Sequence, residues 1–153
     1  MKLRKVVSGG QTGADQAGLR TARATGLEKG GWAPKGWETE DGPAPWLPEY
    51  GLVECPKKGY PARTEANARD SDGTIWFGST DSSGCKATFA ACRRFEKPVF
   101  IVEEEKTRPS DVRAWLEAHD IAVLNVAGNR ESKSPGVGER AQAFLTRVLL
   151  DKS

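Results

Sequence analysis

The stretch "KVVSGGQTGADQAGL" (Lys5 to Leu19) joins a short apolar run to a helical pattern through a loop that holds Gly9, Gly10 and Gly13. The apolar run predicts a buried strand over residues 3–8, and the spacing of alanine and leucine that follows predicts a helix over residues 14–25. Gly26 is placed to end that helix in the left-handed conformation. A strand, a glycine loop and a helix in this order are typical of the first unit of a parallel α/β fold.

The same alternation continues along the chain. Strands are expected near Gly31 and over residues 73–77, 98–102 and 121–126, and helices over residues 61–69, 85–95, 109–119 and 134–150. Residues 30–59 are rich in Gly, Pro and Trp and are expected to form a long irregular insertion loop after the brief strand. Continuous apolar strands that alternate with helices indicate a mainly parallel sheet with helices on both faces, a Rossmann-like three-layer sandwich.

Length and composition exclude several classes of protein. A chain of 153 residues is expected to form a single domain over residues 1–153. The 23 Lys+Arg and 21 Asp+Glu are interspersed and leave a net charge of +2, which argues against a nucleic-acid partner. No apolar run approaches the roughly 20 residues of a membrane span, so no membrane partner and a cytoplasmic location are expected. The three cysteines are odd in number and unpaired in spacing, which argues against a disulfide framework or a thiolate zinc site.

Three loops should meet at the carboxyl edge of the sheet, where such folds bind ligands. They are residues 8–13, 78–84 and 125–132. The first loop combines glycines with a helix N-terminus and so predicts an anion site. It lacks the spacing of a dinucleotide fingerprint and of a P-loop. Thr12 and Asp15 are also spaced as a capping box, which leaves Gln11 as the residue that capping does not explain.

The second loop and the helix over residues 61–69 add further polar groups. Ser83 and Gly84 lie at a second helix N-terminus, although an ordinary serine cap explains that loop equally well. Arg63 and Asn67 share one helix face, and we expect Arg63 to point to the ligand edge and to contribute little to stability. Asp70 and Asp72 stand at a helix end, where carboxylates usually cap and bend the chain.

The chain lacks a conventional catalytic set. His119 is its only histidine, so no Ser-His-Asp, Cys-His or histidine-rich metal site can be assembled. Any catalysis would use carboxylates, arginine and lysine. We therefore assign no catalytic residue and no metal ligand, and an enzyme is the less favoured interpretation.

Five blocks of the sequence together resemble a known family. They are "SGGQTGADQAGL", "GGWAPKGWETEDGP", "YPARTEANARDSDGTI", "SSGCKAT" and "LNVAGNRESKSPG". They resemble the molybdenum cofactor carrier family over nearly the whole chain, from about Val6 to the last expected helix. By fold, that family is related to the lonely-guy nucleotide phosphoribohydrolases and the DNA-processing proteins, all of which are Rossmann-like.

The resemblance implies a cytoplasmic homo-oligomer, a dimer or a tetramer, that binds and protects or stores molybdenum cofactor without transforming it. It also implies molybdoenzymes as recipients. Apart from the resemblance, the two helix N-termini predict bound phosphate, sulfate or molybdate against Gly10 to Gly13 or Ser83 and Gly84. The ligand-binding residues that the resemblance implies are Gly9, Gly10, Gln11, Thr12, Gly13, Lys35, Gly36, Arg63, Thr64, Asn67, Ser83, Gly84, Thr88, Asn125, Gly128 and Arg130.

Two other functions stay open at this point. One is a phosphoribohydrolase acting on nucleoside monophosphates, and the other is a nucleotide-sensing module. The lonely-guy enzymes carry a Pro-Gly-Gly-x-Gly-Thr loop and a following catalytic glutamate, and residues 78–90 contain neither. A hydrolase would need a substitute acid, for which Asp15, Asp72 and Glu131 are the candidates.

Overall fold

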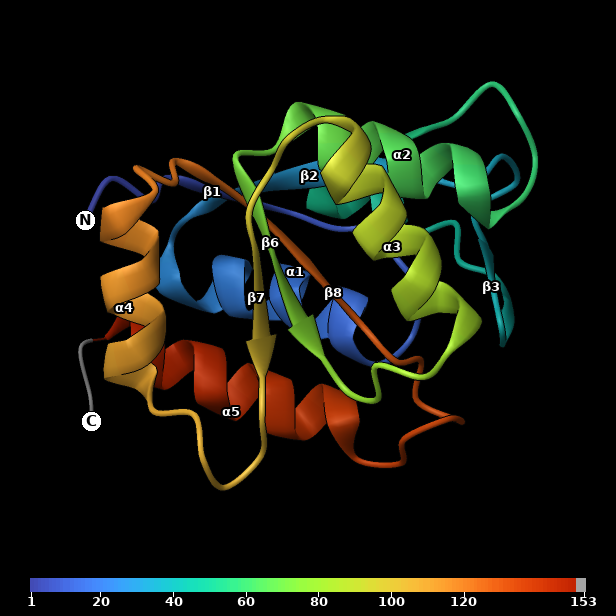
Figure 1. Cartoon of the computed structure of the whole chain (residues 1–153). Helices are drawn as coiled ribbons and strands as arrows, with labels where there is room; N and C mark the ends of the chain where they lie inside the picture. The colour runs from blue at the N-terminus through green and yellow to red at the C-terminus, as the bar shows by residue number, and fades with distance from the viewer. Residues whose placement is uncertain (151–153) are drawn as a thin grey trace.

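The computed structural model describes residues 1–150, and its centre is a six-stranded parallel sheet in the order β5-β2-β1-β8-β6-β7. The strands are β1 (Lys5–Val7), β2 (Glu28–Ala33), β5 (Leu52–Glu54), β6 (Gly73–Phe77), β7 (Val99–Val102) and β8 (Val123–Gly128). Figure 1 shows helices on both sides of this sheet. The expected Rossmann-like α/β class, a mainly parallel sheet between two helical layers, is confirmed.

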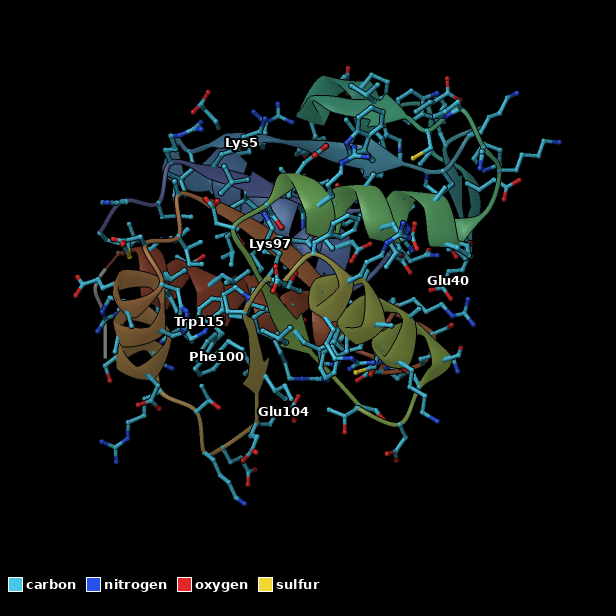
Figure 2. All side chains as sticks on the ribbon, turned by 45° about the horizontal axis from the view of Figure 1, so that its top comes forward. Lys5, Glu40, Lys97, Phe100, Glu104 and Trp115 are labelled. Carbon is cyan, nitrogen blue, oxygen red and sulfur yellow. The ribbon has the colours of Figure 1, made fainter. Side chains whose placement is uncertain are left out.

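The helices divide between the two faces. They are α1 (Ala14–Thr25), α2 (Tyr60–Asp70), α3 (Ser83–Arg94), α4 (Pro109–Ala118) and α5 (Val137–Leu149). Residues of α1, α4 and α5 share the main hydrophobic core, whereas α2 and α3 pack together on the other face (Figure 1). At the β7 edge, Trp115 of α4 packs against Phe100, with ring centroids 5.6 Å apart (Figure 2).

The order and direction of the strands determine at which edge of the sheet a ligand could bind. The chain runs outward from β1 to β2 and β5 on one side and from β6 to β7 on the other, and β8 returns to lie between β1 and β6. The register sets Val7 opposite Asn125 and Phe77 opposite Gly128. Because the three strands are parallel and in register, the loops that follow them leave the sheet at one edge.

Close contact between α1 and the sheet depends on one glycine. A Cβ atom on Gly18 would lie 2.6 Å from the Cβ atom of Val126 in β8. Only glycine lets the helix approach the strand this closely. The helix start therefore lies directly beside the carboxyl end of β8.

Residues 30–59 differ from the expected irregular loop. They contain most of β2, a two-stranded hairpin of β3 (Glu38–Thr39) and β4 (Gly42–Pro43), a 3₁₀ turn η1 (Leu47–Tyr50) and the edge strand β5. Leu47 and Leu52 are buried with Leu19 and Ala33 in a second apolar cluster. Burial against α1 and pairing with β2 give this segment a regular structure that its composition does not predict.

The last helix also begins differently. This helix was expected over residues 134–150, but α5 starts at Val137, and the carboxylate of Glu131 accepts hydrogen bonds from the N–H groups of Gly136 and Gly138. Glu131 thus caps α5 from outside the helix. Among residues 1–150, no helix combines the length and the apolar character that crossing a bilayer requires.

Candidate functional site

A cavity of about 370 Å³ lies at the carboxyl edge of the sheet, between the loops after β1, β6 and β8 and the first turns of α2 and α3. One part of its wall is apolar or aromatic, from Tyr60, Pro61, Trp76, Ala87 and Ala127. The polar lining consists of Gln11, Asp15, Arg63, Thr64, Ser82, Ser83, Gly84, Thr88, Gly128, Asn129, Arg130 and Lys133. Its size falls within the range of small-molecule sites.

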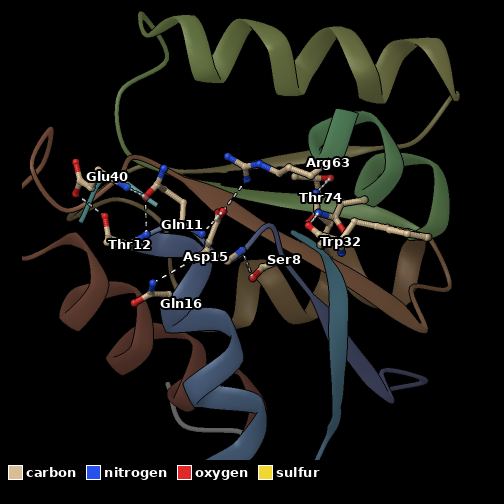
Figure 3. A network of polar contacts seen from close by, with 12 residues as sticks. Ser8, Gln11, Thr12, Asp15, Gln16, Trp32, Glu40, Arg63 and Thr74 are labelled. Atoms are coloured by element: carbon tan, nitrogen blue, oxygen red, sulfur yellow. Dashed lines mark hydrogen bonds and ion pairs between the residues drawn. The ribbon is translucent and has the colours of Figure 1, made fainter. Parts of the chain in front are cut away.

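A buried ion pair forms the floor of the cavity. Arg63 Nη1 lies 2.9 Å from Asp15 Oδ2, and the two side chains are only 14% and 5% exposed (Figure 3). Burial raises the pKa of the Asp15 carboxyl, although the Arg63 charge and the Gln11 N–H act in the opposite direction. This geometry argues against the expectation that Arg63 contributes little to stability, because its guanidinium compensates a buried carboxylate.

Arg63 is held from two further sides. Its guanidinium stacks over the Tyr60 ring, 5.1 Å from the centroid, and a side chain on Gly9 would occupy the space that the guanidinium fills. Its Nε atom is buried without a hydrogen-bond partner among the described residues. Beside it lies a small pocket of about 10 Å³, lined by residues that include Thr88 and Asn125, roughly the space of one water molecule.

Most backbone N–H groups of the first loop are already bonded within the protein. The N–H groups of Gln11, Thr12 and Ala14 bond to Asp15 Oδ2, Gln11 Oε1 and the Asn129 carbonyl. The cap residue of α1 is Gly13, so the expected capping box between Thr12 and Asp15 is not formed. An anion therefore finds few free donors in the backbone of this loop.

The second loop provides the open helix terminus. Ser82 caps α3 by accepting a hydrogen bond from the Cys85 N–H at 3.1 Å. The N–H groups of Ser83 and Gly84 have no partner within residues 1–150, and both residues line the cavity. The serine cap is confirmed, and the two N–H groups that stay unbonded at the helix start are what an anion site would require.

Cations exceed anions around the cavity. Asp15 is paired with Arg63, and Arg130 Nε lies 3.6 Å from the Glu40 carboxylate. The Lys133 ammonium has neither a hydrogen bond nor an ion pair among residues 1–150, and only the backbone N–H of this residue is bonded, to the Arg130 carbonyl. The lining thus carries one uncompensated positive charge, in addition to the positive end of α3.

Glu40, at the turn of the β3–β4 hairpin, reaches two of the ligand-edge loops. Its carboxylate accepts hydrogen bonds from the Thr12 hydroxyl and from the N–H and hydroxyl of Ser132. Its own N–H donates to Gln11 Oε1 at 2.8 Å. Burial alone would raise the pKa of the Glu40 carboxyl, but the hydrogen bonds from Ser132 and Thr12 outweigh it and lower the pKa.

The structure brings together most of the residues that the sequence singled out. Those that line the cavity or the small pocket are Gly9, Gln11, Arg63, Thr64, Asn67, Ser83, Gly84, Thr88, Asn125, Gly128 and Arg130. Among them, both ends of the Asn67 amide already bond to the backbone of Trp32. The Asn125 amide donates to Thr74.

Five of those residues lie outside both pockets: Gly10, Thr12, Gly13, Lys35 and Gly36. Gly10 packs against Leu47, and Thr12 bonds to Glu40 and to the Glu131 N–H. Lys35 is exposed, and the Gly36 N–H bonds to Glu54 in the turn after β2. Gly10, Thr12 and Gly36 thus support the surrounding loops, whereas Lys35 points to solvent.

Two of the three candidate acids are committed elsewhere. Asp72 accepts hydrogen bonds from the N–H groups of Ala122 and Val123, at the edge of the sheet opposite the cavity. Glu131 caps α5. Only Asp15 reaches the cavity, and it is paired with Arg63.

The sequence did not indicate several lining residues. Tyr60 and Trp76 resemble ordinary apolar positions, and Lys133 is a lone lysine in a polar loop. Asn129 lay in a loop that was singled out, and it accepts from the Ser79 N–H at 2.7 Å and so joins the loops after β6 and β8. Its place directly after the apolar run of β8 was the available indication.

A parallel sheet between two helical layers, with a cation-rich cavity at its carboxyl edge, defines a Rossmann-like α/β protein. The chain belongs to the Circularly permutated YpsA SLOG family, whose model matches residues 6–149. The position of β8, the last strand, between β1 and β6 is an unusual strand order for such a sheet.

A solved structure is similar over nearly the whole chain. It is a protein from Syntrophus aciditrophicus that bears the name "Putative molybdenum carrier protein". It is 35% identical, with a TM-score of 0.88 over 97% of this chain and 96% of that chain. No protein of curated function matched. The family and this relative confirm the resemblance found in the five sequence blocks.

Proposed function

We propose that the cavity binds a phosphorylated, ring-containing anion of the molybdenum cofactor type and holds it without transforming it. The observation that carries this proposal is the charge balance of the lining, in which Asp15 is neutralised by Arg63 and Lys133 stays free. A lining with surplus positive charge and free N–H donors favours an anion.

The apolar and the polar parts of the cavity lining suit the ring and the anionic groups of such a ligand, respectively. Molybdenum cofactor combines a flat pterin with a phosphate and a molybdate-bearing dithiolene. The aromatic and apolar side chains of Tyr60, Trp76 and Ala87 offer a surface for a ring. Ser83, Gly84 and Lys133 offer donors for the phosphate or for the oxygens on molybdenum.

The hydrogen bonds of the acidic side chains support binding of the ligand without its hydrolysis. A general base needs a carboxylate that is free to take a proton from water. Asp72 and Glu131 are bonded to backbone N–H groups, and Asp15 is bonded to Arg63. The name of the relative from Syntrophus aciditrophicus agrees with a carrier role.

A cavity-filling variant tests this proposal. Ala87 and Ala90 are both exposed on α3, but only Ala87 lines the cavity. We expect mass spectrometry of freshly purified native protein to detect a pterin in the wild type and in Ala90→Trp. Ala87→Trp should lose it, because the indole fills the space, while both variants keep the wild-type melting temperature.

A functional assay completes the test. The wild-type protein should slow the oxidative loss of molybdenum cofactor before reconstitution of a cofactor-free molybdoenzyme, and Ala87→Trp should not. Release of free base from nucleoside monophosphates, abolished by Asp15→Asn, would refute the carrier function in favour of a hydrolase.

A further inference from the structure

We infer that Glu40 is a positioning residue that orients Gln11 and Arg130 so that this part of the cavity lining presents hydrogen-bond donors and selects oxyanions. The inference rests on the proposed function, since it names the class of group that the same cavity selects. Figure 3 shows Glu40 beside Gln11 and Thr12, at one side of the Asp15–Arg63 pair.

The Glu40 carboxylate fastens the hairpin to both neighbouring loops. Its partners are the Thr12 hydroxyl in the loop after β1 and both the N–H and the hydroxyl of Ser132 in the loop after β8. The side chain is only 13% exposed. With three hydrogen bonds in place, this one carboxylate fixes the hairpin relative to the cavity.

The hairpin in turn orients the amide of Gln11. The atom facing the N–H groups of Thr12 and Glu40 accepts from both, at 3.0 and 2.8 Å, so it must be the oxygen Oε1. Gln11 is 6% exposed and lines the cavity. Its Nε2 group has no partner within residues 1–150. The amide therefore offers the cavity an N–H₂ donor and keeps its acceptor away.

Arg130 is the second residue that Glu40 orients. Its Nε atom lies 3.6 Å from Glu40 Oε1, and the side chain lines the cavity. Together with the N–H groups of Ser83 and Gly84 and the ammonium of Lys133, these groups are donors only. This set of donors suits an oxygen-rich anion that offers acceptors alone, such as a phosphate or molybdate group, and disfavours groups that must donate.

The first experiment needs no ligand and compares Glu40→Ala with Glu38→Ala. Glu38 lies on the same hairpin, is exposed and has no polar partner among the described residues. By NMR, Glu40→Ala should shift the Gln11 side-chain N–H₂ resonances and speed hydrogen exchange at the Ser132 N–H, with Ile75 in β6 unchanged. Glu40→Gln, which keeps one acceptor oxygen, should restore part of the protection, and Glu38→Ala should match the wild type.

The second experiment measures affinity for inorganic molybdate by calorimetry. Charge alone predicts tighter binding in Glu40→Ala, because a negative group near the anion is removed. If Glu40 instead positions the donors, the affinity of Glu40→Ala for molybdate should fall about tenfold, which is equivalent to one lost hydrogen bond. Glu38→Ala should bind like the wild type.

The outcomes separate this inference from the proposed function. Unchanged Gln11 resonances in Glu40→Ala, or tighter molybdate binding, would overturn the positioning role. If the wild type binds no molybdate and releases no pterin, the proposed function fails by itself, and the Gln11 resonances still decide whether Glu40 orients the amide. If Glu40→Ala unfolds, the same resonances in Glu40→Gln decide: unshifted signals would refute the inference.

Discussion

Arg63 Nη1 lies 2.9 Å from Asp15 Oδ2, and this pair joins the first turn of α2 to the first turn of α1 beneath the cavity. Both side chains are largely buried. Each one therefore compensates the charge of the other, which would otherwise be buried without a partner.

Arg63→Ala should lower the free energy of unfolding by roughly 3–5 kcal/mol, the usual cost of leaving a buried charge without its partner. Adding Asp15→Asn should recover part of the loss, because the amide oxygen can still accept from the Gln11 N–H. Urea unfolding measures both. The control is Arg69→Ala, whose partner Asp70 is exposed, where about 1 kcal/mol or less is expected. Equal effects of the two alanine variants would contradict the buried pair.

Crystals soaked in molybdate should show anomalous density at Ser83 and Gly84, near Lys133. No density is expected against the backbone of residues 10–12, whose N–H groups already bond within the protein. Density at the first loop alone would mean that this loop opens to admit the anion.

Lys133→Ala should weaken the binding of molybdate or phosphate by about 1.5–3 kcal/mol, as expected for a hydrogen bond to a charged group. Lys35→Ala should leave affinity unchanged, because Lys35 is exposed and outside the cavity. Titration calorimetry at two salt concentrations measures both. The family resemblance alone assigns Lys35 to the ligand site. Loss of affinity in Lys35→Ala but not in Lys133→Ala would therefore support the resemblance and contradict the assignment from the cavity lining.

Glu131→Ala should destabilise the protein by about 0.5–2 kcal/mol, the range for loss of a helix cap. Gly136 and Gly138 would lose the acceptor for their N–H groups. Glu139→Ala, at an exposed position in the first turn of α5, provides the comparison and should cost less. An unchanged unfolding midpoint in Glu131→Ala would contradict the cap.

Glu40 should give the protein a stabilisation that depends on pH. Its folded-state pKa is lowered, so the contribution is present above the unfolded value of about 4.3 and is lost as the pH falls through the folded value. Arg130 faces the carboxylate, and Asp41 and Glu38 are the other ionisable groups on the hairpin. The stability difference between wild type and Glu40→Gln should shrink steadily on acidification. A difference that grows in acid would mean that the pKa is raised.

Local patterns predicted much of the fold. The helix α1 has the expected bounds because Gly26 ends it in the left-handed conformation, and β6 was identifiable from the buried run "GTIWF". The strand β5 was missed because its residues Leu52–Glu54 are defined as a strand by pairing with β2 and not by an alternating pattern.

The site was predictable in its loops and less so in its individual contacts. Gln11 and Arg63 were found because they accompany a strand end and a helix start. Glu40 was not, since it lies 28 residues from Thr12 and 92 from Ser132 in the sequence. Whether the backbone N–H groups at a helix start are free or already bonded also depends on distant residues. Asn129, for example, accepts from the Ala14 N–H.

The position of β8 has a consequence for biosynthesis. The group β5-β2-β1 and the pair β6-β7 hydrogen-bond to each other only through β8 within the described sheet. When the five other strands of this sheet have been synthesised, the nascent chain can form two half-sheets, and the inner edge of each stays unpaired until residues 123–128 emerge from the ribosome. Long-range pairing of this kind slows folding and exposes strand edges to other chains. Nascent chains that stop before β8 should consequently be the form of this protein that chaperones bind and that aggregates most readily.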